Sequence, residues 1–265
     1  MPSKKAITNS DKKIDDLYGF HKSAFLRSID IIERDVDRLI SQGLTDSVLI
    51  KSKIEIIITK SGYREALDGY LSAGYQDTLN ESYNLYQNLY NKNFNFSPES
   101  LASFSIRKGQ DLGTFSDLLT NYVNSVNKQL VNSSLSGISS ALTTEAASGI
   151  ASTLGLYSQT ELETSVARLY RTANNLLASD NGIELFQYTG PTSGNIRPFC
   201  LEHVGQIKTR AAWNELNNGP RQPKPVMEFQ GGYRCRHSLI GVPGELLGYF
   251  EGIETETRAA AEARQ

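Results

Sequence analysis

The chain has few cysteines and no long apolar run. Only two of its 265 residues are cysteine, which is too few for a disulfide framework and is typical of a protein made in a reducing compartment. No apolar segment reaches the roughly 18 residues that a membrane-spanning helix requires, and the N-terminal Met-Pro-Ser-Lys-Lys lacks the apolar core of a signal peptide. We therefore expect a protein that is assembled in the cytoplasm and has no membrane-spanning segment.

The chain also lacks an excess of charge of either sign. It carries 27 Lys and Arg against 29 Asp and Glu, for a formal net charge of −2. This balance gives no general affinity for nucleic acid, so any contact with a phosphate backbone has to come from a local basic patch. With 39% hydrophobic residues, 21 Gly and 8 Pro, the composition excludes a collagen-like or wholly disordered chain.

Helical periodicity dominates the first two thirds of the chain. Helices are predicted over residues 17–40, 63–90, 110–130 and 161–178. Gly43 is placed to cap the first of these, and Ser97 followed by Pro98 is the signature of a further helix start. Residues 47–60 are rich in isoleucine, and their pattern leaves both helix and strand open.

Two features of the helical region indicate how it packs. Four tyrosines lie at helical spacing on the predicted helix 63–90: Tyr70, Tyr83, Tyr86 and Tyr90. Such a stripe is typical of a helix–helix seam, and it exceeds what a two-helix hairpin needs to bury, so we expect self-association or docking on a partner. Residues 132–155 are mostly small, and residues 133–137 are the expected hinge. The small residues of this segment could allow helices to pack closely or could form a flexible connector, and the sequence leaves both interpretations open.

The pattern changes after residue 182. Residues 183–188 are a predicted strand, closed by a turn at 189–191, and residues 209–216 are a predicted short helix with Trp213 as its core aromatic. The predicted fold class is mainly α, with a long helical N-terminal region and a small α+β module at the C-terminus. The expected domains are a polar tail (1–12), a helical docking region (13–155), the α+β module (156–250) and a charged tail (251–265).

Two motifs in this module carry the most specific information. They are Arg197-Pro198-Phe199-Cys200 and Gly231-Gly232-Tyr233-Arg234-Cys235-Arg236-His237. Together they resemble the C-terminal module of the minor head proteins of tailed phages, the group related to protein F of phage Mu. The resemblance covers about residues 160–242. Further matching positions are Thr164, Ala167, Arg168, Asn174, Tyr188, Gly190, Pro191, Asn218 and Gly219.

The resemblance implies a function that composition and periodicity do not give. It implies a structural virion protein, present in few copies inside the head near the portal, with a part in head assembly, DNA packaging or genome delivery. The implied partners are the phage portal and capsid proteins and the packaged double-stranded DNA.

Cysteine and histidine side chains in this module leave three interpretations open. Cys200, His203, Cys235 and His237 together have the donor atoms of a tetrahedral zinc site. Alternatively, the two cysteines are small buried hydrophobic residues, or they form a disulfide, which assembly in the cytosol disfavours. We favour burial without a cofactor and keep zinc as the alternative. The corresponding alternative function is a zinc-supported nucleic-acid-binding module on a helical oligomerisation arm.

No enzyme is expected. A Cys–His nucleophilic pair needs an activated thiolate and a third, orienting group, and no oxyanion-hole signature accompanies Cys200 and His203. Gly231 and Gly232 match neither the Rossmann nor the Walker phosphate-binding pattern. Two glycines before a strand more simply allow a positive-φ turn or a close backbone approach.

The closing motif is predicted to continue as a strand over residues 233–237, paired with the strand 183–188, which brings Cys235 close to Cys200. Strand alternation should then bury Tyr233, Cys235 and His237 and turn the two intervening arginines outwards.

Basic residues gather in the same module. Residues 190–240 contain seven Lys or Arg against three Glu, a local excess of four positive charges. Ordinary solvated charge is the simpler interpretation. Contact with phosphate through Arg197, Arg234 and Arg236 is the alternative, since guanidinium groups suit that geometry.

Overall fold

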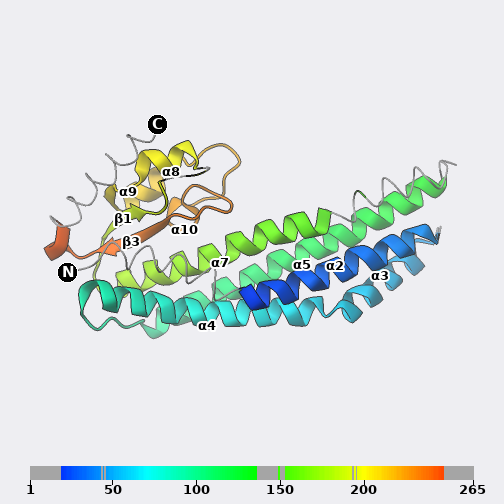
Figure 1. Ribbon diagram of the computed structural model, residues 1–265, viewed down its shortest axis with the longest axis horizontal. Coiled ribbons are helices and arrows are strands. Elements are labelled where there is room, and N and C mark those ends of the chain that lie inside the picture. The colour runs from blue at the N-terminus through cyan, green and yellow to red at the C-terminus, as the bar shows by residue number, and fades with distance from the viewer. Residues whose placement is uncertain are drawn as a thin grey trace. The chain divides into compact units, whose positions relative to one another are not determined.

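The computed structural model of the chain describes residues 19–42, 44, 46–135, 149, 153–192, 194 and 196–247. Long helices come first, and a small sheet follows the last of them (Figure 1). This confirms the predicted fold class, mainly α with a small α+β module. Gly43, the end of the expected hinge and both expected tails lie outside the described residues. None of the described helices is long and apolar enough to cross a membrane.

Among the described residues, five long helices precede the sheet. They are α2 (Gly19–Ser41), α3 (Ser47–Ser61), α4 (Tyr63–Tyr90), α5 (Pro98–Leu135) and α7 (Thr153–Asp180). The helix start predicted at Ser97 is confirmed, because its hydroxyl accepts a hydrogen bond from the backbone N–H of Ser100 at 3.0 Å. The helix expected over 110–130 is the continuation of the one that starts there, so α5 is a single helix.

The structure resolves the ambiguous segment 47–60 as a helix. Ile50, Ile54 and Ile58 recur every four residues and are fully buried along one side of α3. Both ends are capped: the Asp46 carboxylate accepts hydrogen bonds from two backbone N–H groups of the first turn, each 2.8 Å long. Gly62 ends the helix in the left-handed conformation, with φ of 70°. Caps and a period of four therefore favour the helix over the strand.

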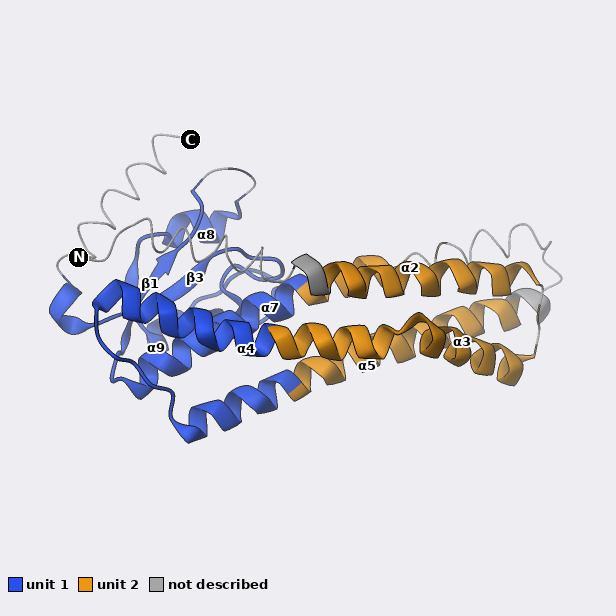
Figure 2. Cartoon of the chain, turned by 60° about the horizontal axis from the view of Figure 1, so that its bottom comes forward, with its two compact units in different colours: residues 1–17, 74–108, 163–265 blue, residues 18–73, 109–162 orange. Residues whose placement is uncertain are grey.

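The chain divides into two compact units, and the division falls within α4, α5 and α7 (Figure 2). One unit comprises residues 18–73 and 109–162, and we call it the helical unit. Its core contains the ring of Phe25, whose centroid lies 5.0 Å from that of Tyr63 and 5.7 Å from that of Phe115. The other comprises residues 1–17, 74–108 and 163–265, and we call it the mixed unit because it contains the sheet.

The sheet of the mixed unit has three antiparallel strands in the order β2-β1-β3. The strands are β1 (Leu185–Thr189), β2 (Ile207–Thr209) and β3 (Ser238–Val242). Short helices lie between them in the sequence: α8 (Pro198–His203), α9 (Arg210–Glu215) and α10 (Val226–Phe229). Trp213 in α9 is fully buried and its indole N–H donates to the carbonyl of Phe186 at 2.9 Å, which confirms its prediction as a core aromatic.

Tyrosines of α4 pack against β3. The Tyr86 hydroxyl accepts a hydrogen bond of 2.7 Å from the backbone N–H of Gly241, and the Tyr90 hydroxyl donates to the carbonyl of the same glycine. These hydroxyls satisfy backbone groups of an edge strand that would otherwise be open to another chain. Three of the four tyrosines of the stripe, Tyr70, Tyr86 and Tyr90, are buried within the chain itself. Most of the stripe is therefore covered by the chain itself, and self-association or docking on a partner stays a prediction.

The strand predicted at 233–237 is wrong. These residues form turns and irregular backbone, and β3 begins only at Ser238. The left-handed conformation of Gly232 and Arg234, with φ of 104° and 55°, breaks an extended chain. Tyr233 is 40% exposed, against the prediction. Cys235 and His237 are buried and both arginines are exposed, as predicted.

Candidate Cys/His site

A buried arginine of α7 holds the closing motif in place. Arg171 is 2% exposed, and its guanidinium donates hydrogen bonds to three backbone carbonyls. The bonds to His237 are 3.1 and 2.9 Å long, the bond to Glu228 is 3.2 Å long, and a further bond goes to Cys235. The carbonyls of the irregular segment before β3 therefore accept hydrogen bonds from a side chain. In a β-strand, they would accept from the backbone N–H groups of the adjacent strand.

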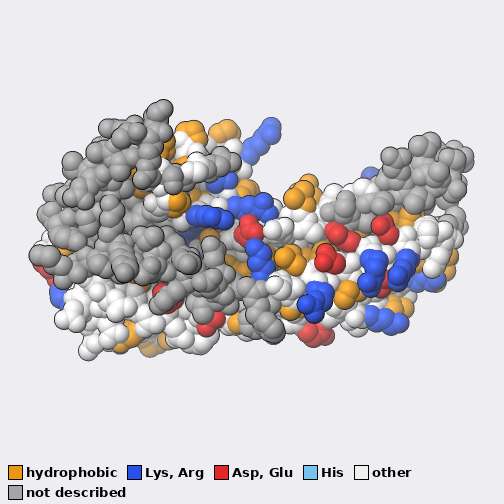
Figure 3. Space-filling model, in the orientation of Figure 1, with side chains coloured by type: hydrophobic (Ala, Val, Ile, Leu, Met, Phe, Trp, Pro, Cys, Tyr) orange, Lys and Arg blue, Asp and Glu red, His pale blue; other side chains and the backbone are white. Residues whose placement is uncertain are grey.

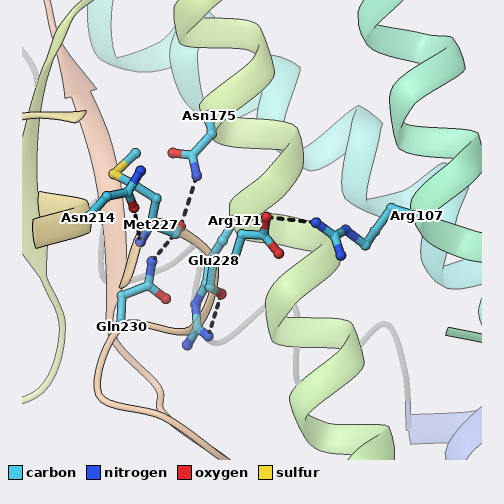
Figure 4. A network of polar contacts seen from close by, with 7 residues as sticks. All are labelled: Arg107, Arg171, Asn175, Asn214, Met227, Glu228 and Gln230. Carbon is cyan, nitrogen blue, oxygen red and sulfur yellow. Dashed lines mark hydrogen bonds and ion pairs between the residues drawn. The ribbon is translucent and has the colours of Figure 1, made fainter. Parts of the chain in front are cut away.

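A second set of polar contacts fixes α10 (Figure 4). The Met227 carbonyl accepts from the side-chain amides of Asn175 and Gln230, at 2.9 and 3.0 Å, and its N–H donates to the amide oxygen of Asn214 at 3.2 Å. Arg107 of α5 forms an ion pair of 2.6 Å with the Glu228 carboxylate. Two asparagines and an arginine from three helices, α7, α9 and α5, thus anchor the short segment that leads into Gly231.

The two cysteines meet as predicted. Cys200 lies in α8 and Cys235 in the segment before β3, and their sulfurs are 3.6 Å apart. Both are buried free cysteines. The Tyr188 hydroxyl of β1 donates to the sulfur of Cys200 at 3.3 Å and lies 3.8 Å from that of Cys235. Three elements that are distant in sequence therefore converge on one small polar centre.

One of the two histidines joins this centre. The Nδ1 atom of His237 lies 3.8 Å from the Cys235 sulfur, and its ring stacks on Tyr188 with centroids 5.2 Å apart. The ligand atoms of Cys200, Cys235 and His237 all lie within 4.8 Å of one another. His203 is not part of this group: its Nδ1 atom bonds to the Phe199 carbonyl at 2.8 Å. The predicted four-residue ligand set is therefore corrected to three.

The electrostatics of the centre separate the two thiols. The hydrogen bond from Cys200 lowers the pKa of Cys235, with a further contribution from the Arg171 guanidinium. The same hydrogen bond, together with burial, raises the pKa of Cys200. Burial also raises the pKa of Tyr188, which keeps its phenol neutral and able to donate.

Two glycines leave room for these side chains. A Cβ atom at Gly231 would collide with the Cys200 sulfur and would lie 3.3 Å from that of Cys235. A Cβ atom at Gly190, where φ is 151°, would lie 2.5 Å from the His237 ring. Gly231 and Gly190 are therefore positions of close approach, and Gly232 supplies the positive-φ turn.

The three arginines predicted as phosphate contacts have different surroundings. Arg197 donates to the carbonyl of Tyr233 at 2.6 Å, which ties the first motif to the second. Arg234 forms an ion pair of 3.0 Å with Glu163 of α7. Arg236 is exposed. Arg197 and Arg234 therefore have structural partners, and Arg236 presents its charge to solvent.

Sequence reasoning missed Arg171 and Asn175 of α7, which organise the site, although the resemblance included Thr164 and Arg168 of the same helix. Thr164, Arg168, Arg171 and Asn175 recur at three- and four-residue steps and are all buried. This spacing was visible, but periodicity assigns a polar stripe on a helix to solvent.

Comparison of the chain with protein-family models, curated proteins and solved structures finds no match.

Proposed function

We propose that this chain is a structural protein of the head of a tailed phage, a minor head protein that acts in head assembly, DNA packaging or genome delivery near the portal. The proposal is carried by the resemblance of the two motifs and by one observation. The residues that bear the resemblance lie together in space: Arg197 bonds to Tyr233, Cys200 contacts Cys235, and Gly190 admits the ring of His237.

The long helices suit a scaffolding role. The α5 helix has 38 residues, which corresponds to a length of about 57 Å at a rise of about 1.5 Å per residue. A helix of this length offers a rigid surface to large partners such as the portal and capsid proteins that we propose.

The burial of the cysteines supports a structural role over a catalytic one. Cys200 and Cys235 are 2% and 4% exposed, whereas a nucleophilic thiolate has to be reached by its substrate. We therefore propose that the chain has no enzymatic turnover and that its Cys/His site serves the fold.

Quantitative mass spectrometry of purified, DNA-filled particles from a phage that encodes this chain tests the proposal. We expect the chain in a few copies per particle, well below the number of shell subunits. Absence from filled particles would overturn the proposal, and hundreds of copies would replace it with a shell or decoration protein.

A zinc-supported nucleic-acid-binding module is the second candidate function. The convergence of Cys200, Cys235 and His237 and the exposure of Arg236 favour it. On the face shown in Figure 3, basic and acidic side chains are interspersed along the long helices. A binding titration of the full chain with double-stranded DNA over a range of salt tests the second candidate, because each phosphate contact contributes a slope of about −0.9 in log K against log salt. A steep slope that Arg236→Ala reduces would favour the second candidate.

A further inference from the structure

We propose that Cys200, Cys235 and His237 bind one zinc ion that joins the two motifs of the C-terminal module. Cys200 belongs to α8 and the other two residues to the segment before β3, so the ion would connect parts of the chain that are far apart in sequence. The proposal goes beyond the role in the phage head and does not depend on it.

Two of the three distances between the ligand atoms fit a zinc tetrahedron, and the third, between Cys200 and His237, is within 4.8 Å. Zn–S bonds of about 2.3 Å and Zn–N bonds of about 2.0–2.1 Å place two sulfurs about 3.8 Å apart, and a sulfur and a nitrogen about 3.6 Å apart. The sulfurs of Cys200 and Cys235 are 3.6 Å apart, and the Cys235 sulfur is 3.8 Å from Nδ1 of His237. These two edges agree with the tetrahedron within a few tenths of an ångström.

The imidazole presents the nitrogen that a metal needs. Nε2 of His237 lies 3.0 Å from the carbonyl of Pro191. Because a carbonyl accepts, Nε2 carries the proton, and the lone pair of Nδ1 faces the sulfur of Cys235. In histidine ligands, the N–H of the second ring nitrogen commonly donates a hydrogen bond to a backbone carbonyl in this way, which fixes the tautomer and the ring orientation.

The donor types of the site favour zinc. Cysteine binds a metal as the thiolate, so zinc binding would displace the thiol protons of Cys200 and Cys235 and release them to solvent. Two soft sulfur ligands and one imidazole select zinc over magnesium or calcium, which prefer oxygen.

Tyr188 and Gly231 shape the rest of the coordination sphere. Three protein ligands leave one tetrahedral position, and the hydroxyl oxygen of Tyr188 lies 3.3 and 3.8 Å from the two sulfurs. Gly231 keeps side-chain atoms away from both sulfurs. Since all three ligands are buried, the ion would be closed off from solvent, as structural zinc ions are.

The metal content of the full chain tests the proposal. The chain is produced in zinc-supplemented medium without a metal-binding tag, and zinc is measured by plasma mass spectrometry. We expect one zinc per chain in the wild type and at least a tenfold loss in Cys235→Ser and His237→Gln. His203→Asn is the matched control, because His203 is a buried histidine of the same module outside the group, and it should keep its zinc.

Cobalt substitution provides a readout that does not depend on the variants. Co²⁺ added anaerobically to the metal-free, reduced wild type should give sulfur-to-cobalt charge-transfer absorption and the intense visible bands of tetrahedral coordination. Zinc absent from the wild type together with no thiolate–cobalt band would overturn the proposal. So would a stoichiometric metal other than zinc, or equal zinc loss in His203→Asn and His237→Gln when circular dichroism shows both variants folded.

Discussion

Both units of the chain have an apolar core, but they differ in their buried polar contacts. In the helical unit, side chains pack on side chains: the ring of Phe25 lies against Tyr63 and Phe115, and an isoleucine stripe fills one side of α3. In the mixed unit, buried polar side chains bind the backbone, as Arg171 and Trp213 do. Apolar packing requires residues of the right size at the right spacing, whereas a buried guanidinium needs specific acceptors at one position.

The largest effect is expected from the aromatic core of the helical unit. Phe25→Ala should lower the free energy of unfolding by about 3–5 kcal/mol, because it removes a fully buried ring and leaves a cavity. Ile56→Ala in α3 is the control: Ile56 is 49% exposed, so its loss should cost less than about 1 kcal/mol. Denaturant unfolding measures both. Equal costs for the two variants would show that Phe25 is not in a packed core.

Replacement of the buried arginine tests the other half of the comparison. Arg171→Met keeps much of the volume but leaves the carbonyls of Glu228, Cys235 and His237 without their donor. It should cost about 3 kcal/mol, since each unsatisfied buried carbonyl costs about 1–3 kcal/mol and local shifts recover part of the loss. Hydrogen exchange should rise in peptides that cover 226–242 before it rises in α2 and α3.

Arg64→Met is the matched control for that experiment. Arg64 forms an exposed ion pair of 3.3 Å with Glu55 in the helical unit, and exposed pairs contribute about 0–1 kcal/mol. If Arg64→Met destabilised the chain as much as Arg171→Met, the distinction between surface charge and buried backbone binding would fail.

These contrasts also explain what the sequence could reveal. Helices α2, α4 and α7 were predictable from their apolar periodicity, whereas the isoleucine-rich pattern of α3 left both helix and strand open. Cys200 and Cys235 meet as predicted, although the prediction relied on a strand at 233–237 that these residues do not form. The irregular backbone at 233–237 was not predictable, since its carbonyls bind Arg171, which is distant in sequence and lies on a polar stripe that periodicity assigns to solvent. His203 looked equivalent to His237 by composition, and only its bond to Phe199 separates them.

Glycine substitutions should have opposite signs in the two units. A Cβ atom at Gly241 would lie 2.8 Å from Ala178 Cβ and 2.8 Å from the Tyr86 hydroxyl, so Gly241→Ala should cost about 1–3 kcal/mol by overpacking. A Cβ atom at Gly113, within α5, would meet nothing within 4 Å. Gly113→Ala should therefore stabilise the chain by about 0.5–1 kcal/mol. Thermal unfolding measures the change in melting temperature of each variant. If both variants shifted the melting temperature in the same direction, the assignment of Gly241 to a crowded position and Gly113 to an open one would be contradicted.

The smallest effect concerns the pH dependence of the helical unit. Glu33 accepts a hydrogen bond from the Gly155 N–H at 2.7 Å, and burial raises its pKa above the ordinary value of 4.5. A raised folded-state pKa stabilises the fold below 4.5, and this contribution is lost as the pH rises through the folded-state pKa. Glu33→Gln removes the titration. As the pH rises from 4.5 through the folded-state pKa of Glu33, we expect the free energy of unfolding of the wild type to fall relative to that of the variant. A rise over the same pH range would show that the fold favours the ionised carboxylate.

Disulfide trapping tests most directly the central claim, that the two motifs form one site. The metal-free full chain is oxidised gently under native conditions and in denaturant, then digested and analysed by mass spectrometry. We predict a cross-link between the peptides of Cys200 and Cys235, whose sulfurs lie 3.6 Å apart, with a much higher yield in the folded chain than in denaturant. Rapid, independent alkylation of both cysteines in the folded chain, with no native-state gain in cross-linking, would contradict the account.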